Sequence, residues 1–179
     1  MSILLDPDDD VAVTRTLLGC HDPAGDAFVV HPTATSRRPR EVAHDVLAAL
    51  GAPAAALFPE HLGWATTAWS AVRAWLSAFR IEYLVILRAH RFDADTWTHL
   101  IDLTRGTEVS LVLVCHTGAV PARLAATVHG VAHQVIDFAT LPQVLDAHPG
   151  LRPRRARPAR PRRYGELPSD LPTRYTDTV

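Results

Sequence analysis

The feature that most constrains this fold is a set of short runs that are apolar at every position. Two of them, Tyr83–Leu87 and Ser110–Cys115, are interrupted by no charged residue. A strand that is apolar at consecutive positions is buried on both faces, which is typical of a parallel sheet covered by helices on both sides. Shorter runs occur at Ser2–Leu5, Ala27–Val30 and Gln134–Phe138. The sequence therefore predicts a three-layer α/β domain with a mostly parallel sheet of about five strands, of the P-loop-NTPase-like or Rossmann-like type.

Segments with helical periodicity separate these runs. Apolar residues share one face of a helix between Glu41 and Leu50, which Gly51 ends. The segment from Trp64 to Phe79 carries three tryptophans, and we expect these in the core rather than on a binding surface. Further helices are expected at residues 8–18, from Asp93 or Asp95 onwards, from Pro121 to about His129, and after Thr140 and Gln143, which have capping-box spacing.

The character of the chain changes near residue 148. Residues 1–150 hold 10 arginines against 16 acidic residues, whereas residues 151–179 hold 8 against 3, and the 179 residues contain no lysine. The segment 152–163 mixes three prolines with seven arginines: Arg152, Arg154, Arg155, Arg157, Arg160, Arg162 and Arg163. Such a segment has nothing apolar to bury and favours an extended, disordered chain. We therefore expect an α/β domain over 1–147 and an Arg/Pro-rich disordered tail over 148–179.

This tail is the clearest candidate for binding a polyanion. Arginines spaced along an extended chain can neutralise nucleic-acid phosphates without discriminating between base sequences. They could equally bind an acidic protein surface, or the segment could be a solvated linker. We expect a protein partner and nucleic-acid binding through the tail, and we leave the oligomeric state open.

The cysteine content and hydropathy indicate a cytoplasmic protein without membrane contact. Two cysteines, Cys20 and Cys115, do not make a disulfide framework. No apolar run approaches the roughly 18 residues of a membrane span, and the acidic first ten residues do not resemble a signal peptide.

The run from Leu84 to His90 resembles the Walker B strand end of AAA-type and related P-loop ATPases. In that family the apolar strand commonly ends in Asp-Glu and continues with Ala-His. Here Ala89-His90 remain, whereas Leu87 stands at the aspartate position and Arg88 at the glutamate position. The strand ending at His116 resembles the family's next strand, whose end carries the sensor residue. In order of elements, the chain is similar to the ATPase accessory proteins of bacterial transposons and integrative elements, which implies a role in mobile-element biology.

The same resemblance places the phosphate-binding loop between Ser2 and about Val13. The expected pattern is Gly-x-x-x-x-Gly-Lys-Ser/Thr, in which glycines let backbone N–H groups surround phosphate and the lysine contacts it. The sequence offers Asp6-Pro-Asp-Asp-Asp10 instead, with four carboxylates, no glycine and no lysine. The carboxylates that would hold Mg²⁺ and activate water are also missing. We therefore expect a non-hydrolysing accessory or scaffold protein, and we leave open whether 6–10 replaced an ancestral phosphate loop.

A second group of residues suggests a different class of function. His31, His90 and His116 each follow the end of a predicted strand, and Cys115 adjoins His116. The carboxyl ends of parallel strands meet at one edge, so these side chains could form a metal site or the centre of a small metal- or histidine-dependent enzyme. Asp93 or Asp137 would then orient a histidine. The alternative is that they are polar residues entering loops. We expect no cofactor, with zinc at this cluster as the alternative.

Overall fold

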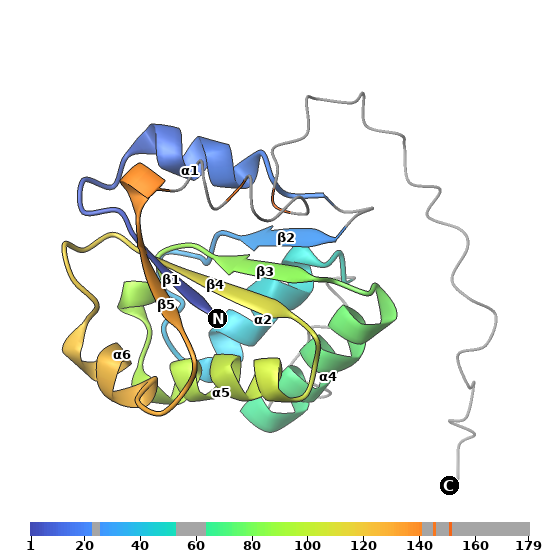
Figure 1. Cartoon of the computed structure of the whole chain (residues 1–179). Helices are drawn as coiled ribbons and strands as arrows, with labels where there is room; N and C mark the ends of the chain where they lie inside the picture. Colours follow the sequence, from blue (N-terminus) through green and yellow to red (C-terminus); the bar gives the residue numbers. More distant parts are fainter. Residues whose placement is uncertain (23–25, 53–63, 141–144, 146–150, 152–179) are drawn as a thin grey trace, which may run out of the picture.

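A five-stranded parallel sheet forms the centre of the computed structural model, which describes residues 1–22, 26–52, 64–140, 145 and 151 (Figure 1). The strands run in the order β2-β3-β4-β1-β5, and every neighbouring pair is parallel. Their bounds are Ser2–Leu5 (β1), Ala27–Val30 (β2), Tyr83–Ile86 (β3), Ser110–Cys115 (β4) and Gln134–Asp137 (β5). The predicted α/β class and the predicted number of strands are confirmed.

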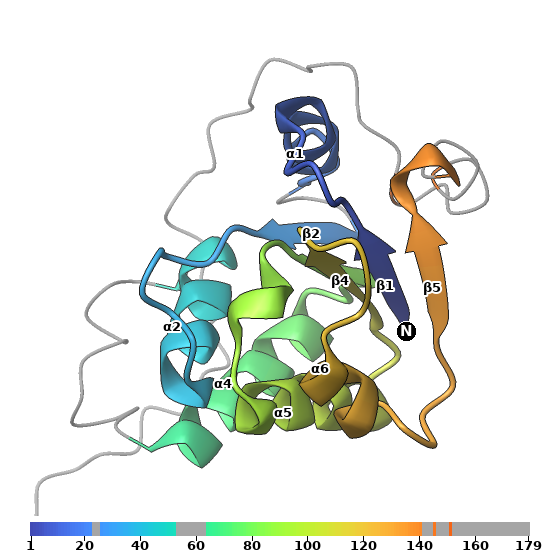
Figure 2. The same cartoon turned by 90° about the vertical axis from the view of Figure 1, so that its left-hand side faces the viewer.

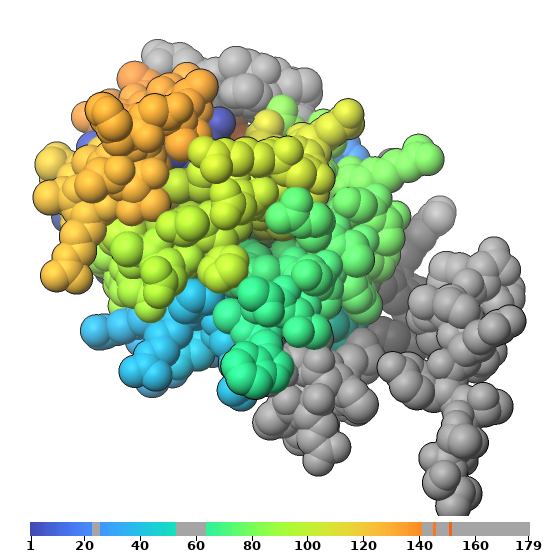
Figure 3. All heavy atoms as spheres, turned by 90° about the horizontal axis from the view of Figure 1, so that it is seen from below, coloured from blue at the N-terminus to red at the C-terminus, as the bar shows by residue number. Residues whose placement is uncertain are grey.

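In the described part of the chain, helices cover the two faces of the sheet unequally (Figure 2). One face carries α2 (Pro39–Ala49), α4 (Ala65–Ala78), α5 (Ala94–Arg105) and α6 (Ala122–Thr127). The opposite face carries α1 (Val11–Leu18). Figure 3 looks onto the first of these surfaces, where α2, α4 and α5 lie side by side. The result is the expected three-layer arrangement.

Alternate side chains of the apolar strands pack into two hydrophobic cores, one on each face of the sheet. In β3, Leu84 and Ile86 point into the core beneath α2, α4 and α5, while Val85 points into the core beneath α1. Leu113 and Val114 alternate in the same way on β4. Complete burial of each such side chain stabilises the fold by about 1.5–3 kcal/mol. The continuous apolar runs of the sequence thus reflect burial on both sides of the sheet.

The structure corrects one prediction about the tryptophans. Trp69 is buried and Trp75 is partly buried, as expected, but Trp64 is 80% exposed. The physical reason is that Trp64 is the N-cap of α4 and precedes the apolar stripe that the helix buries. The prediction that all three tryptophans lie in the core is therefore wrong for Trp64.

The start of the first helix also differs from the sequence prediction. The helix begins at Val11 rather than at Asp8, because Asp10 acts as the N-cap and its carboxylate accepts from the Ala12 N–H at 2.7 Å. The residues before it form a separate turn.

Two predictions fall on residues that the structure does not describe. The capping-box helix after Thr140 involves residues 141–144, and the tail begins at 148, of which only Leu151 is described. The arginines 152–163 also lie outside the described residues. No helix in the described part of the chain has the length and apolar character needed to cross a membrane.

Candidate functional site

Three loops meet at the carboxyl ends of neighbouring strands β3, β4 and β1. They are the segment 6–10 after β1, the segment 88–90 after β3, and His116 after β4. The chain leaves β1 toward α1 on one face, whereas it leaves β4 toward α6 on the other (Figure 2). In open parallel sheets, adjacent strands whose connections leave to opposite faces mark the crevice where ligands bind. The site is therefore placed where the topology favours one.

Asp6 is the buried anchor of this site. Its side chain is only 2% exposed, and its backbone N–H donates to the Cys115 carbonyl at 2.9 Å, continuing the pairing of β1 with β4. Its carboxylate accepts from the Asp10 N–H, with both oxygens 3.1–3.2 Å from that nitrogen. The Oδ2 atom also lies 3.0 Å from His116 Nδ1. Asp6 thus connects the start of α1 to the end of β4.

Asp9 approaches the same imidazole from the solvent side. Its Oδ1 lies 3.1 Å from His116 Nδ1, and its carboxylate pairs with the Arg88 guanidinium at 3.1–3.2 Å. Asp9 and Arg88 both adopt left-handed backbone conformations, with φ of 48° and 56°. Such conformations cost side-chain-bearing residues roughly 1–3 kcal/mol each, which the surrounding contacts must offset.

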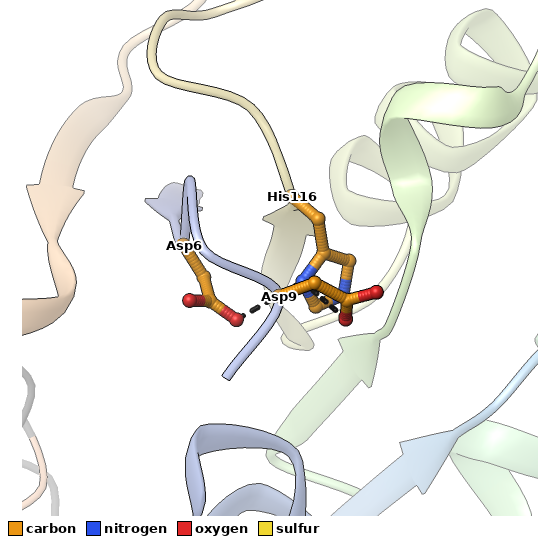
Figure 4. A group of neighbouring side chains, drawn as sticks. All are labelled: Asp6, Asp9 and His116. Atoms are coloured by element: carbon orange, nitrogen blue, oxygen red, sulfur yellow. Dashed lines mark hydrogen bonds and ion pairs between the residues drawn. The ribbon is translucent and has the colours of Figure 1, made fainter. Parts of the chain in front are cut away.

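His116 lies at the centre of the group, as Figure 4 shows. Its side chain is 4% exposed, and its Nδ1 faces the two carboxylates. The Nε2 atom is buried and has no hydrogen-bond partner among the described residues. The backbone N–H of His116 donates to His90 Nδ1 at 3.2 Å, and the two rings meet edge to face at 5.7 Å.

His90 is held as a neutral acceptor. Burial is the largest cause that lowers the pKa of His90, and the neighbouring His116, Arg91 and Arg88 lower it further. Because its Nδ1 accepts a hydrogen bond, the ring proton of neutral His90 resides on Nε2. His90 thus fixes the backbone of His116 without adding positive charge.

The predicted strand-end cluster is brought together only in part. His90 and His116 are in contact, but Cys115 is buried in the core and burial raises the pKa of its thiol to about 12. His31 is exposed after β2, an edge strand two places from β4. Of the four predicted residues, only His116 belongs to the group of converging ligand atoms found among the described residues, and His31, His90 and Cys115 do not.

Other sequence candidates occupy structural positions. Leu87 is buried in the core beneath α1, and Arg88 pairs with Asp9. Asp93 caps α5 by accepting from the Thr96 N–H, and Asp137 accepts from the Ala139 N–H. The carboxylates that contact His116 among the described residues are those of Asp6 and Asp9. In the sequence, Asp6 and Asp9 pointed only to the expected phosphate-binding loop. Both residues follow shortly after a predicted strand end, which is compatible with contact to His116. Predicting that contact from the sequence would have required knowing the order of the strands in the sheet.

The group that the family resemblance implies, a Mg²⁺-bound nucleotide, does not fit this loop. A phosphate at a helix N-terminus needs free backbone N–H groups. Here the Asp10 and Ala12 N–H groups are already bonded to carboxylates of the loop itself, and Pro7 has no N–H. The positive end of α1 is thus neutralised internally by acidic side chains.

Comparison with known proteins finds a distant structural similarity and no match to a protein family or to a curated protein. No protein-family model matches the sequence, and no curated protein matches it. The chain is similar to one in the structure of Drosophila ORC bound to AT-rich DNA and Cdc6, with a TM-score of 0.45 and 13% sequence identity. That match covers 81% of this chain and 26% of the other, so this chain spans about a quarter of its length.

Proposed function

We propose that this chain is a non-hydrolysing accessory or scaffold protein, related to the AAA-type ATPases, that acts through protein contacts and nucleic-acid binding. The observation that carries the proposal is the closed loop at Asp6–Asp10, whose own carboxylates bond the N–H groups that a phosphate would need. The three segments named by the resemblance also meet at one place, since Asp9 contacts both Arg88 and His116.

Electrostatics supports the loss of nucleotide binding. Two like unit charges about 4 Å apart repel by about 4 kcal/mol near a protein surface. The segment Asp6–Asp10 carries four carboxylates, which would repel an incoming phosphate, while Arg88 is already paired with Asp9. Arg88 also stands where the family has its catalytic glutamate, so no carboxylate is available there to activate water.

The nucleotide part of the proposal is tested by calorimetric titration of the full chain with ATP and Mg²⁺, together with a phosphate-release assay. We expect no saturable heat and no phosphate above the blank. Saturable binding at micromolar ATP would contradict the proposal, as would phosphate release that the Asp6→Asn substitution abolishes.

The nucleic-acid part rests on the charge of the tail. The arginines of 152–163 could neutralise up to seven phosphates. Each neutralised phosphate contributes about −0.9 to the slope of log K against log salt, so full engagement predicts a slope of about −6. Binding of this kind positions a protein on a duplex without selecting its sequence.

Fluorescence anisotropy with a labelled DNA duplex tests this prediction, using a salt series from about 50 to 200 mM. The full chain is compared with a variant in which all seven arginines of 152–163 are glutamine. Arg174→Gln, which removes one charge elsewhere in the tail, is the matched control. We expect binding by the wild type and the control, and its loss in the sevenfold variant. Equal binding by all three proteins would refute a role for this segment.

A further inference from the structure

We propose that Asp6, Asp9 and His116 form a binding site for one divalent transition-metal ion, with Zn²⁺ as the best match. Each residue offers one ligand atom, and these atoms all lie within 4.8 Å of one another. The proposal is independent of the accessory function proposed above, because it concerns only what the cluster binds.

The charge of the cluster favours a cation. Asp6 is almost wholly buried, and among the described residues its carboxylate contacts only the Asp10 N–H and the His116 imidazole. Arg88 pairs with Asp9, so its charge offsets one of the two carboxylates. Buried charges in proteins are paired or coordinate metals, and a divalent ion between Asp6 and Asp9 would pair with both carboxylates.

The geometry requires only small movements. Zinc lies about 2.0–2.2 Å from nitrogen and oxygen ligands, which places tetrahedral ligand atoms about 3.4 Å apart. His116 Nδ1 is now 3.0 Å from Asp6 Oδ2 and 3.1 Å from Asp9 Oδ1. Both distances are within a few tenths of an ångström of the tetrahedral value, and the ligand atoms of the three residues lie no more than 4.8 Å apart.

The unpartnered Nε2 atom of His116 allows the ring proton to move from Nδ1 to Nε2 when Nδ1 binds a metal. A histidine that binds a metal through Nδ1 must carry its proton on Nε2. No described residue bonds His116 Nε2, so none of them holds that atom as an acceptor. His90 meanwhile fixes the His116 backbone, which limits the movement of the ligand loop.

The donor set selects the class of metal. Mg²⁺ and Ca²⁺ prefer shells of oxygen ligands, whereas an imidazole with carboxylates suits zinc, cobalt and related first-row ions. Three protein ligands leave a fourth position for water. Solvent can reach the cluster from the Asp9 side, because the Asp9 side chain is 45% exposed.

The decisive experiment is calorimetric titration of the metal-free full chain with Zn²⁺, comparing Asp9→Asn with Asp8→Asn. Both variants remove one negative charge from the same exposed turn, but only Asp9 offers a ligand atom. We expect one tight site per chain in the wild type, at least tenfold weaker binding in Asp9→Asn, and no more than a twofold change in Asp8→Asn. Equal affinity in these two variants would overturn the proposal.

Three further measurements keep the test specific. Asp9 lies on the surface, so Asp9→Asn should fold, and far-ultraviolet circular dichroism checks that it does. His133→Gln, at an exposed histidine, should leave the tight site unchanged, and its loss there would place the metal elsewhere. Co²⁺ should replace Zn²⁺ without a thiolate-to-cobalt absorption band. Such a band would assign the metal to a cysteine and refute this ligand set.

Discussion

Replacing Asp6 by alanine should destabilise the protein strongly although the side chain is short. The change removes the acceptor of the Asp10 N–H and one of the two acceptors at His116 Nδ1. Hydrogen bonds to a charged group contribute about 1.5–3 kcal/mol each when the site is buried. His116 Nδ1 keeps its contact with Asp9 Oδ1 at 3.1 Å, so the stabilisation of His116 is lost only in part. We therefore expect the free energy of unfolding to fall by about 3–4 kcal/mol.

Urea unfolding followed by far-ultraviolet circular dichroism measures this difference, with a chelator present so that bound metal does not contribute. The midpoint should fall while the slope stays constant, because the surface exposed on unfolding is unchanged. Asp6→Asn is the informative partner, since its amide can still accept from the Asp10 N–H and can donate to the other tautomer of His116. We expect it to lose no more than about 1–2 kcal/mol. A folded Asp6→Ala protein destabilised by less than about 1 kcal/mol would refute the proposed role of Asp6 as anchor.

Three other predictions follow from the described contacts. Burial raises the pKa of the Cys20 thiol to about 11 and that of Cys115 to about 12, so both should resist thiol reagents at pH 8 and react only as urea unfolds the chain. Backbone N–H groups at the start of α2 lower the pKa of Glu41, so its stabilisation is present above the unfolded value near 4.5 and is lost as pH falls through the lower folded value. Glu41→Gln should thus cost about 0.5–1 kcal/mol at pH 7, and the difference from wild type should vanish in acid unfolding experiments. Leu113→Ala, in the middle of the sheet, should lower the free energy of unfolding by about 2–5 kcal/mol in urea, whereas a loss below 1 kcal/mol would contradict its complete burial.

The central strands β3 and β4 were predictable because each is buried on both sides, which leaves an apolar run that local sequence alone reveals. Leu84, Val85 and Ile86 show the pattern clearly, since adjacent residues enter different cores. The exposure of Trp64 was not predictable from helical spacing, because the spacing does not say at which residue the helix begins.

The candidate site was predictable only as a location. Sequence analysis placed His90 and His116 at strand ends, and these do meet. Whether Asp6 and Asp9 or His31 lie next to these histidines could not be predicted, because it depends on which strands are adjacent in the sheet. Strand order is set by packing between distant parts of the chain, and it puts β1 beside β4 while β2 lies at the edge.

The position of β1 also has a consequence for how the chain assembles during synthesis. Ser2 pairs with Val112 on one side and with Gln134 on the other, so β1 has both partners more than a hundred residues downstream. At about 5–20 residues per second, a ribosome needs on the order of ten seconds to supply the first of them. During that interval Ile3 and Leu4 lack the neighbours that bury them, and pairing between such distant segments is intrinsically slow. A nascent chain stalled before Cys115 should therefore remain sensitive to protease at β1, whereas release beyond Asp137 should protect this strand.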